Sequence, residues 1–202
     1  MNKCLNDYRL LEKWAVLMDG VFSLSDLKNV FNEKTLPLLH RRVRVLVSIG
    51  ALTRFKREFY VTKDFNLEVL SQRLYPDSYI SLGTVLARRL LIGSIPTKTA
   101  YAVKTGRNRT FNSVAGNLVF CGIVPYLMFG FEYENGLRYA TAEKAFLDTL
   151  YFYLKGFRFS FNIFEDIAVD QLDVPEVRSM LKHYKNPKFV TFARGVLSGR
   201  HS

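Results

Sequence analysis

The chain has 202 residues, which is enough for one ordinary domain or two small ones. Hydrophobic residues make up 49% of it and aromatic residues 14%, with only 12 Gly and 6 Pro, and this excludes a disordered or collagen-like chain. Lys and Arg total 29 against 18 Asp and Glu, so the net charge is +11. An excess of this size favours a polyanionic partner, nucleic acid before an anionic membrane surface.

Cysteine usage and hydropathy favour a cytoplasmic protein. The two cysteines, Cys4 and Cys121, lie far apart, whereas a secreted disulfide framework needs more pairs. Charged residues interrupt the N-terminal segment, so we expect no signal peptide. The longest apolar run, 123–131, is too short to span a membrane. The three histidines, His40, His183 and His201, show no metal-ligand spacing, and we expect neither a metal nor a cofactor.

The N-terminal third predicts three helices followed by a hairpin. Apolar residues recur at helical spacing over 5–18, and a shorter helix follows Ser23, whose partner three residues on is Asp26, as in a capping box. A third helix runs from Thr35, a plausible N-cap, to about residue 49. Two extended runs, 51–54 and 59–61, flank a polar tip at 56–58. This order is typical of a winged helix-turn-helix, which we assign to residues 1–65.

The remainder predicts a second domain of mixed character. Residues 66–78 are interpreted as a connector, and residues 79–202 as an α+β domain with a small, mostly antiparallel sheet and C-terminal helices. Asn135-Gly136 predicts a hairpin turn, and Thr141 predicts the N-cap of a helix. Expected strands lie around 101–103, 109–111, 118–120 and 131–133, and expected C-terminal helices around 163–169, 174–184 and 189–197.

The third helix carries the strongest functional pattern. At about 100° per residue, one arc holds apolar residues that we expect in the core: Leu36, Leu39, Val43, Leu46 and Val47. Arg41, Arg44 and Ser48 fall on the opposite face, which suits a major groove because Arg binds guanine bidentately. The segment 35–57 contains no acidic residue. The predicted DNA-binding residues are Thr35, Arg41, Arg44, Ser48, Arg54, Lys56 and Arg57. With about six phosphate contacts, the log–log salt slope would be roughly −5.

A second stretch without acidic residues lies between Asp77 and Glu132. Its basic residues form a possible second polyanion contact: Arg88, Arg89, Lys104, Arg107 and Arg109. The alternative is that they are simply the basic outer face of a small sheet.

One helix in the second domain brings together Glu143, Lys144 and Asp148, residue types that a nuclease uses. The favoured interpretation is structural: Glu143 complements the helix dipole, and Lys144 with Asp148 forms a surface pair at i,i+4. We therefore expect a protein that is not an enzyme, with a nuclease using Glu143 and Asp148 as one alternative. The other alternative is a protein-interaction module whose basic face binds an acidic partner.

Three segments resemble the AbiEi antitoxin family of bacterial abortive-infection systems: 79–82, 105–111 and 136–148, the last with the run Ala-Thr-x-Glu-Lys-Ala-x-x-Asp. The stretch ending Gly50-Ala51-Leu52, with Tyr60-Val61, is similar to the winged helix of that family. The resemblance covers most of residues 1–155. Ala142 stands where the family often has Pro, and Gly83 where a residue that favours helix more is common.

This resemblance implies a two-domain antitoxin. The winged helix would bind inverted repeats of double-stranded DNA in its own promoter and repress the operon. The C-terminal domain would counteract a nucleotidyltransferase-like toxin encoded beside it, in a type IV toxin–antitoxin system in which the two proteins need not form a stable complex.

Overall fold

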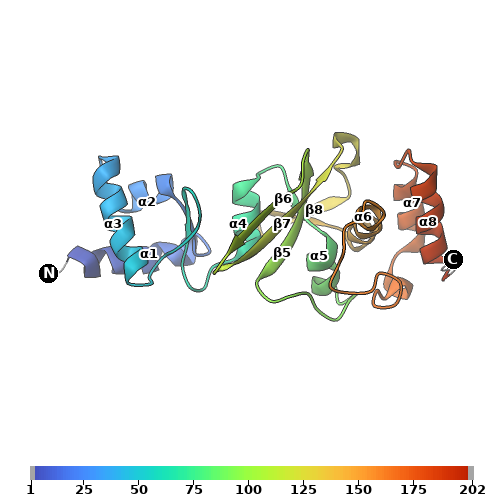
Figure 1. Ribbon diagram of the computed structural model, residues 1–202, viewed down its shortest axis with the longest axis horizontal. Helices are drawn as coiled ribbons and strands as arrows, with labels where there is room; N and C mark the ends of the chain where they lie inside the picture. Colours follow the sequence, from blue (N-terminus) through green and yellow to red (C-terminus); the bar gives the residue numbers. More distant parts are fainter. Residues whose placement is uncertain (1–2, 200–202) are drawn as a thin grey trace. The chain divides into compact units, whose positions relative to one another are not determined.

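The computed structural model describes residues 3–199, and these form eight α-helices and two sheets of three and six strands (Figure 1). The predicted α+β class is confirmed. The chain divides into two compact units. The first takes the chain up to Leu70 together with Phe111–Asn117, and the second takes Ser71–Thr110 and the chain from Leu118 onward. The division at Leu70 falls within the segment expected as a connector, where Leu67–Leu74 form helix α4.

The first unit contains three helices and a three-stranded sheet. The helices are α1 (Lys3–Leu17), α2 (Leu24–Val30) and α3 (Leu36–Ser48). The strands β1 (Val21–Ser23), β2 (Thr53–Lys56) and β3 (Phe59–Val61) pair in the order β1-β3-β2. The three helices and the hairpin of β2 and β3 are as predicted. Strand β1 was not predicted, because Ser23 was interpreted only as the N-cap of the helix that follows it.

Local chemistry explains where α2 and α3 begin. The capping box is confirmed: Ser23 Oγ accepts from the Asp26 N–H at 3.1 Å, while the Ser23 N–H donates to Asp26 Oδ2 at 2.6 Å. Thr35 occupies the N-cap position of α3, but its side chain makes no capping hydrogen bond. Pro37 lies in the first turn of α3, where its missing N–H costs no helical hydrogen bond.

The core of the first unit corrects part of the predicted apolar arc of α3. Leu39, Val43 and Leu46 are buried, but Leu36 is 53% exposed and Val47 is 37% exposed, so the prediction was wrong for these two. Three residues three or four positions apart suffice to seal α3 onto the core. The core residues are Leu11, Phe22, Leu27, Phe31, Leu39, Val43, Leu46, Leu52 and Tyr60.

The six-stranded sheet has the order β6-β7-β5-β4-β9-β8. Its strands are β4 (Tyr79–Ile80), β5 (Thr99–Thr105), β6 (Arg109–Ser113), β7 (Gly116–Ile123), β8 (Phe131–Glu134) and β9 (Leu137–Ala140). Strand β4 pairs antiparallel with β5 and parallel with β9. The turn between β8 and β9 is the predicted Asn135-Gly136, with φ of 50° and 80°, as a two-residue hairpin requires.

The second unit also contains helices α5 (Leu82–Arg88), α6 (Ala142–Leu154), α7 (Val174–Leu181) and α8 (Pro187–Leu197). Thr141 caps α6 as predicted, its side chain accepting from the Lys144 N–H. Helix α6 lies between the sheet and the pair α7 and α8 (Figure 1). The helix predicted at 163–169 is wrong. Asp166 accepts from the Asn162 N–H and Asn162 from the Phe164 N–H, side-chain bonds that compete with a helix there.

Candidate nucleic-acid interface

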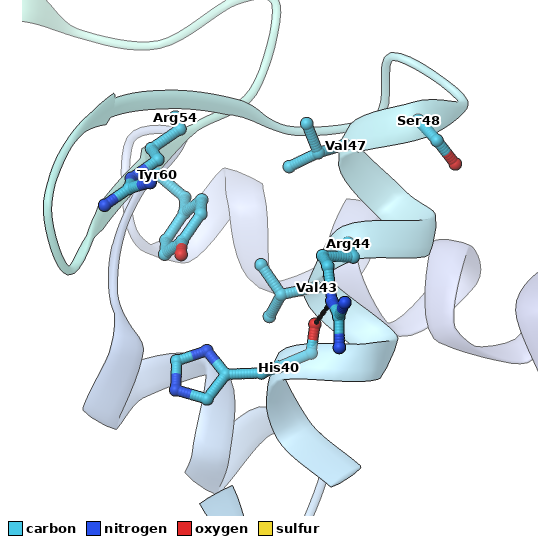
Figure 2. Close-up of a pocket in the computed structure, with 7 residues that line it drawn as sticks. All are labelled: His40, Val43, Arg44, Val47, Ser48, Arg54 and Tyr60. Atoms are coloured by element: carbon cyan, nitrogen blue, oxygen red, sulfur yellow. Dashed lines mark hydrogen bonds between the residues drawn. The ribbon is translucent and has the colours of Figure 1, made fainter. Parts of the chain in front are cut away.

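The outer face of α3 presents the two arginines that the sequence analysis selected. Arg41 and Arg44 are both exposed, and among the described residues neither forms an ion pair with a carboxylate. The Arg44 Nε–H donates to the His40 carbonyl oxygen at a long 3.4 Å, a bond along its own helix (Figure 2). Both guanidinium groups therefore keep most of their donors for an external acceptor.

Arg42, between these two arginines, has a different role. It donates to Asp7 of α1 from Nε at 3.0 Å and from a terminal nitrogen at 2.5 Å, and to Glu33 at 3.2 Å. Its side chain is only 15% exposed. The hydrogen bond to Asp7, first among several causes, raises the pKa of Arg42 above its ordinary value. Arg42 thus joins α3 to α1 and to the turn before α3, and leaves the outer face to its neighbours.

A hollow of about 730 Å³ opens beside this face of α3. Arg44 and Ser48 of α3 line it together with Arg54 of β2, and its other lining residues are His40, Val43, Val47 and Tyr60. Figure 2 shows Arg54 and Tyr60 across the hollow from Val43, Val47 and Arg44. No carboxylate lines the hollow. The helix and the hairpin therefore offer one concave, cationic surface with a partly apolar floor.

Four residues that line the hollow were not among the predicted contacts: His40, Val43, Val47 and Tyr60. Four predicted contacts do not line it: Thr35, Arg41, Lys56 and Arg57. Tyr60 is only 8% exposed and belongs to the core of the first unit, yet it also lines the hollow. Val47 was assigned to the core arc. Arg41 is exposed but does not line the hollow, so it lies on the same helix beside the concave surface.

The remaining predicted contacts are accessible to different degrees. Thr35 is exposed at the start of α3. The Ser48 hydroxyl donates to the Val45 carbonyl at 2.8 Å, so it retains only acceptor capacity for a ligand. Lys56 Nζ lies 5.6 Å from the centroid of the Phe59 ring, a cation–π contact. Arg57 lies 3.9 Å from Glu58 at the hairpin tip, where both are largely exposed and the pair is weak.

The second basic stretch separates into two groups. Arg88 and Arg89 both donate to Glu134, at 2.9 and 2.5 Å. These two are therefore held by a protein carboxylate, which weakens their case as a polyanion contact. Lys104, Arg107 and Arg109 cluster around the connection of β5 and β6. The pKa of Lys104 is lowered chiefly by burial and in second place by the nearby charge of Arg109.

The interpretation of Lys144 and Asp148 as a surface pair is wrong. Both side chains have no exposed area, and they form an ion pair inside the second unit. Tyr79 and Ser81 donate hydroxyl hydrogen bonds to Asp148 Oδ2, each at 2.9 Å, and Lys144 Nζ also lies 3.2 Å from the Tyr184 hydroxyl. A Lys and an Asp four positions apart have the same spacing on an exposed helix face and on a buried one. The sequence therefore did not reveal that this pair is buried.

Burial dominates the titration of this cluster. Burial lowers the pKa of Lys144, although the negative charge of Asp148 and the hydrogen bond to it act to raise that pKa. Burial also raises the pKa of Tyr79 and of Tyr184 well above the ordinary tyrosine value. Glu143, at the first turn of α6, accepts from the Asp173 N–H at 3.2 Å. A carboxylate with no exposed area cannot reach a substrate, so this cluster is suited to holding α6 in place.

No group of three or more His, Cys, Asp or Glu residues within 3–199 is arranged to hold a metal ion, and His201 lies outside the described residues. None of the described helices is long and apolar enough to cross a membrane. No protein-family model and no curated protein matches the sequence.

Proposed function

We propose that the first unit is a winged helix-turn-helix that binds double-stranded DNA, with α3 as the recognition helix and the hairpin of β2 and β3 as the wing. The observation that carries the proposal is the hollow in which Arg44 of α3 and Arg54 of β2 face a common space without a carboxylate. A recognition helix reads base edges in the major groove, while a neighbouring hairpin contacts the backbone.

In this proposal Arg41 and Arg44 read base edges, and Arg54, Lys56 and Arg57 hold phosphates. Each bidentate contact to a guanine is worth about 1–3 kcal/mol of discrimination. Thr35 lies at the start of the helix, where an exposed hydroxyl reaches a phosphate oxygen. Tyr60 and His40 add donors within the same hollow.

The test is a mobility-shift assay on the DNA upstream of the protein's own reading frame. Arg41→Ala/Arg44→Ala should weaken binding at least about 30-fold, the equivalent of about 2 kcal/mol for two base contacts. The control is Arg9→Ala/Lys13→Ala, which removes the same charge from exposed positions of α1 and should retain most of the affinity. Undiminished binding by the α3 variant, or equal loss in both variants, would contradict the assignment.

We further propose that the protein is the autorepressor and antitoxin of a toxin–antitoxin operon, acting through the second unit on a nucleotidyltransferase-like toxin. The resemblance of residues 136–148 to the AbiEi family supports this role. Cells that express the product of the adjacent reading frame should grow again when this chain is co-expressed. The Arg41→Ala/Arg44→Ala variant should still relieve toxicity while it loses repression. Toxicity that the wild-type chain does not relieve would refute the antitoxin role.

A further inference from the structure

The C-terminal pair of helices contains a second cationic hollow. It measures about 530 Å³ and is lined by residues in or directly after α7 and α8 of the second unit. Arg178 of α7 and Lys182, at its C-terminal end, line one wall, and Arg194, Leu197 and Ser198 line the other. Each set shares a helix face: 178 and 182 are four positions apart, and 194, 197 and 198 are three and four positions apart.

The three cations face this hollow without compensation. Arg178, Lys182 and Arg194 are exposed, and no ion pair connects any of them to a carboxylate within the described residues. No acidic residue lines the hollow. Two like charges four positions apart on a helix destabilise it by about 0.2–0.5 kcal/mol, and the third cation across the hollow adds to that repulsion. An anion bound between the helices would relieve it.

The acidic residues of α7 lie at the other end of the helix. Asp173 caps its N-terminus, and Glu176 lies in its first turn. Burial, and then the charges of Glu143 and Asp173, raise the pKa of Glu176. These carboxylates therefore gather beside the start of α6, which leaves the cations at the C-terminal end of α7 unneutralised. The helix is divided into an acidic start and a basic end.

We propose that this hollow binds the phosphodiester backbone of a single-stranded nucleic acid. Three cations in one hollow match a chain of successive phosphates better than a single monovalent anion. The cations line a concavity formed by two helices, and a flexible single strand can bend to follow such a surface, whereas a rigid duplex cannot. Leu197 supplies an apolar wall for a ribose or base, and Ser198 a hydroxyl. The proposal does not depend on duplex binding by the first unit.

The experiment compares two probes on the full chain: a 12-nucleotide single-stranded oligouridine and the upstream DNA duplex. Fluorescence anisotropy follows binding by the wild type and by Arg178→Gln/Lys182→Gln/Arg194→Gln. We expect this variant to bind the oligouridine at least about tenfold more weakly and with a salt slope shallower by about 2, since each phosphate contact contributes about 0.7 on a single strand. Its affinity for the duplex should stay within about twofold of the wild type.

The matched control removes three exposed cations elsewhere in the second unit, as Lys155→Gln/Arg158→Gln/Lys188→Gln. Equal loss of oligouridine binding in this control, or equal loss of duplex binding in the hollow variant, would show a diffuse charge effect and overturn the proposal. Displacement of the oligouridine by micromolar ATP or inorganic phosphate would assign the hollow to a small anion and overturn it too. The melting temperature of the hollow variant is measured by circular dichroism. If it equals that of the wild type, a loss of oligouridine binding is not caused by unfolding.

Discussion

The buried pair of Lys144 and Asp148 gives the sharpest stability prediction. Lys144→Met keeps most of the side-chain volume but removes the ammonium, so the Asp148 carboxylate remains buried with only the hydroxyls of Tyr79 and Ser81 as donors. Breaking a buried pair in this way costs about 3–5 kcal/mol. For a chain of this size each kcal/mol lowers the melting temperature by about 2–4 °C, so we expect a fall of about 6–20 °C.

The assay is urea unfolding followed by far-UV circular dichroism. Lys144→Met/Asp148→Asn removes both charges and should recover at least about 2 kcal/mol of the free energy of unfolding relative to the single variant, which a double-mutant cycle isolates. Lys13→Met removes an exposed lysine of α1 and serves as the control, with a change below about 0.5 kcal/mol. A loss below about 1 kcal/mol for Lys144→Met would match an exposed pair and refute the reasoning. If the double variant is no more stable than Lys144→Met, the loss of stability comes from altered packing and not from the unpaired Asp148 carboxylate.

Three further predictions concern stability. Arg42→Met should lower the free energy of unfolding by about 2 kcal/mol, because Asp7 and Glu33 lose their partner in a partly buried site, and the urea midpoint measures this. Ser23→Ala removes the capping box of α2 and should lower the free energy of unfolding by about 1 kcal/mol, measured by urea unfolding. An unchanged free energy of unfolding would mean that α2 begins at this position without the cap. Burial raises the pKa of Cys121 to about 12, above its unfolded value near 9, so the folded state keeps a proton that the unfolded state loses. Stability is then fully present below pH 9 and falls by up to about 4 kcal/mol as pH rises to 12. Cys121→Ala should show a shallower alkaline loss in melts across this range.

The sequence predicted the elements whose causes are local. The helices of the first unit and the turn at Asn135-Gly136 follow from periodicity, caps and turn chemistry, each read within a few residues. The exposure of Arg41 and Arg44 followed from the same helical period.

What the sequence did not predict depends on partners far along the chain. A helical wheel places Arg42 about 200° away from Arg44, but only the approach of Asp7 from α1 shows that Arg42 is structural. Glu134 reaches Arg88 and Arg89 across more than forty residues. Gly83 lies in a tightly packed site: a Cβ there would lie 2.9 Å from a methyl group of Ile95, which would have to move.

The two-residue strand β4 has a consequence for how the second unit folds. The hairpin of β8 and β9 closes locally, but Tyr79 and Ile80 alone join it to β5, by pairing with Val103 and Ala102 on one side and Tyr139 on the other. These partners are distant in sequence, so a large loop-closure entropy must be met for very few backbone hydrogen bonds. We therefore expect the pairing of β4 with β9 to form after its pairing with β5, because Tyr139 lies much farther along the chain from Ile80 than Ala102 does.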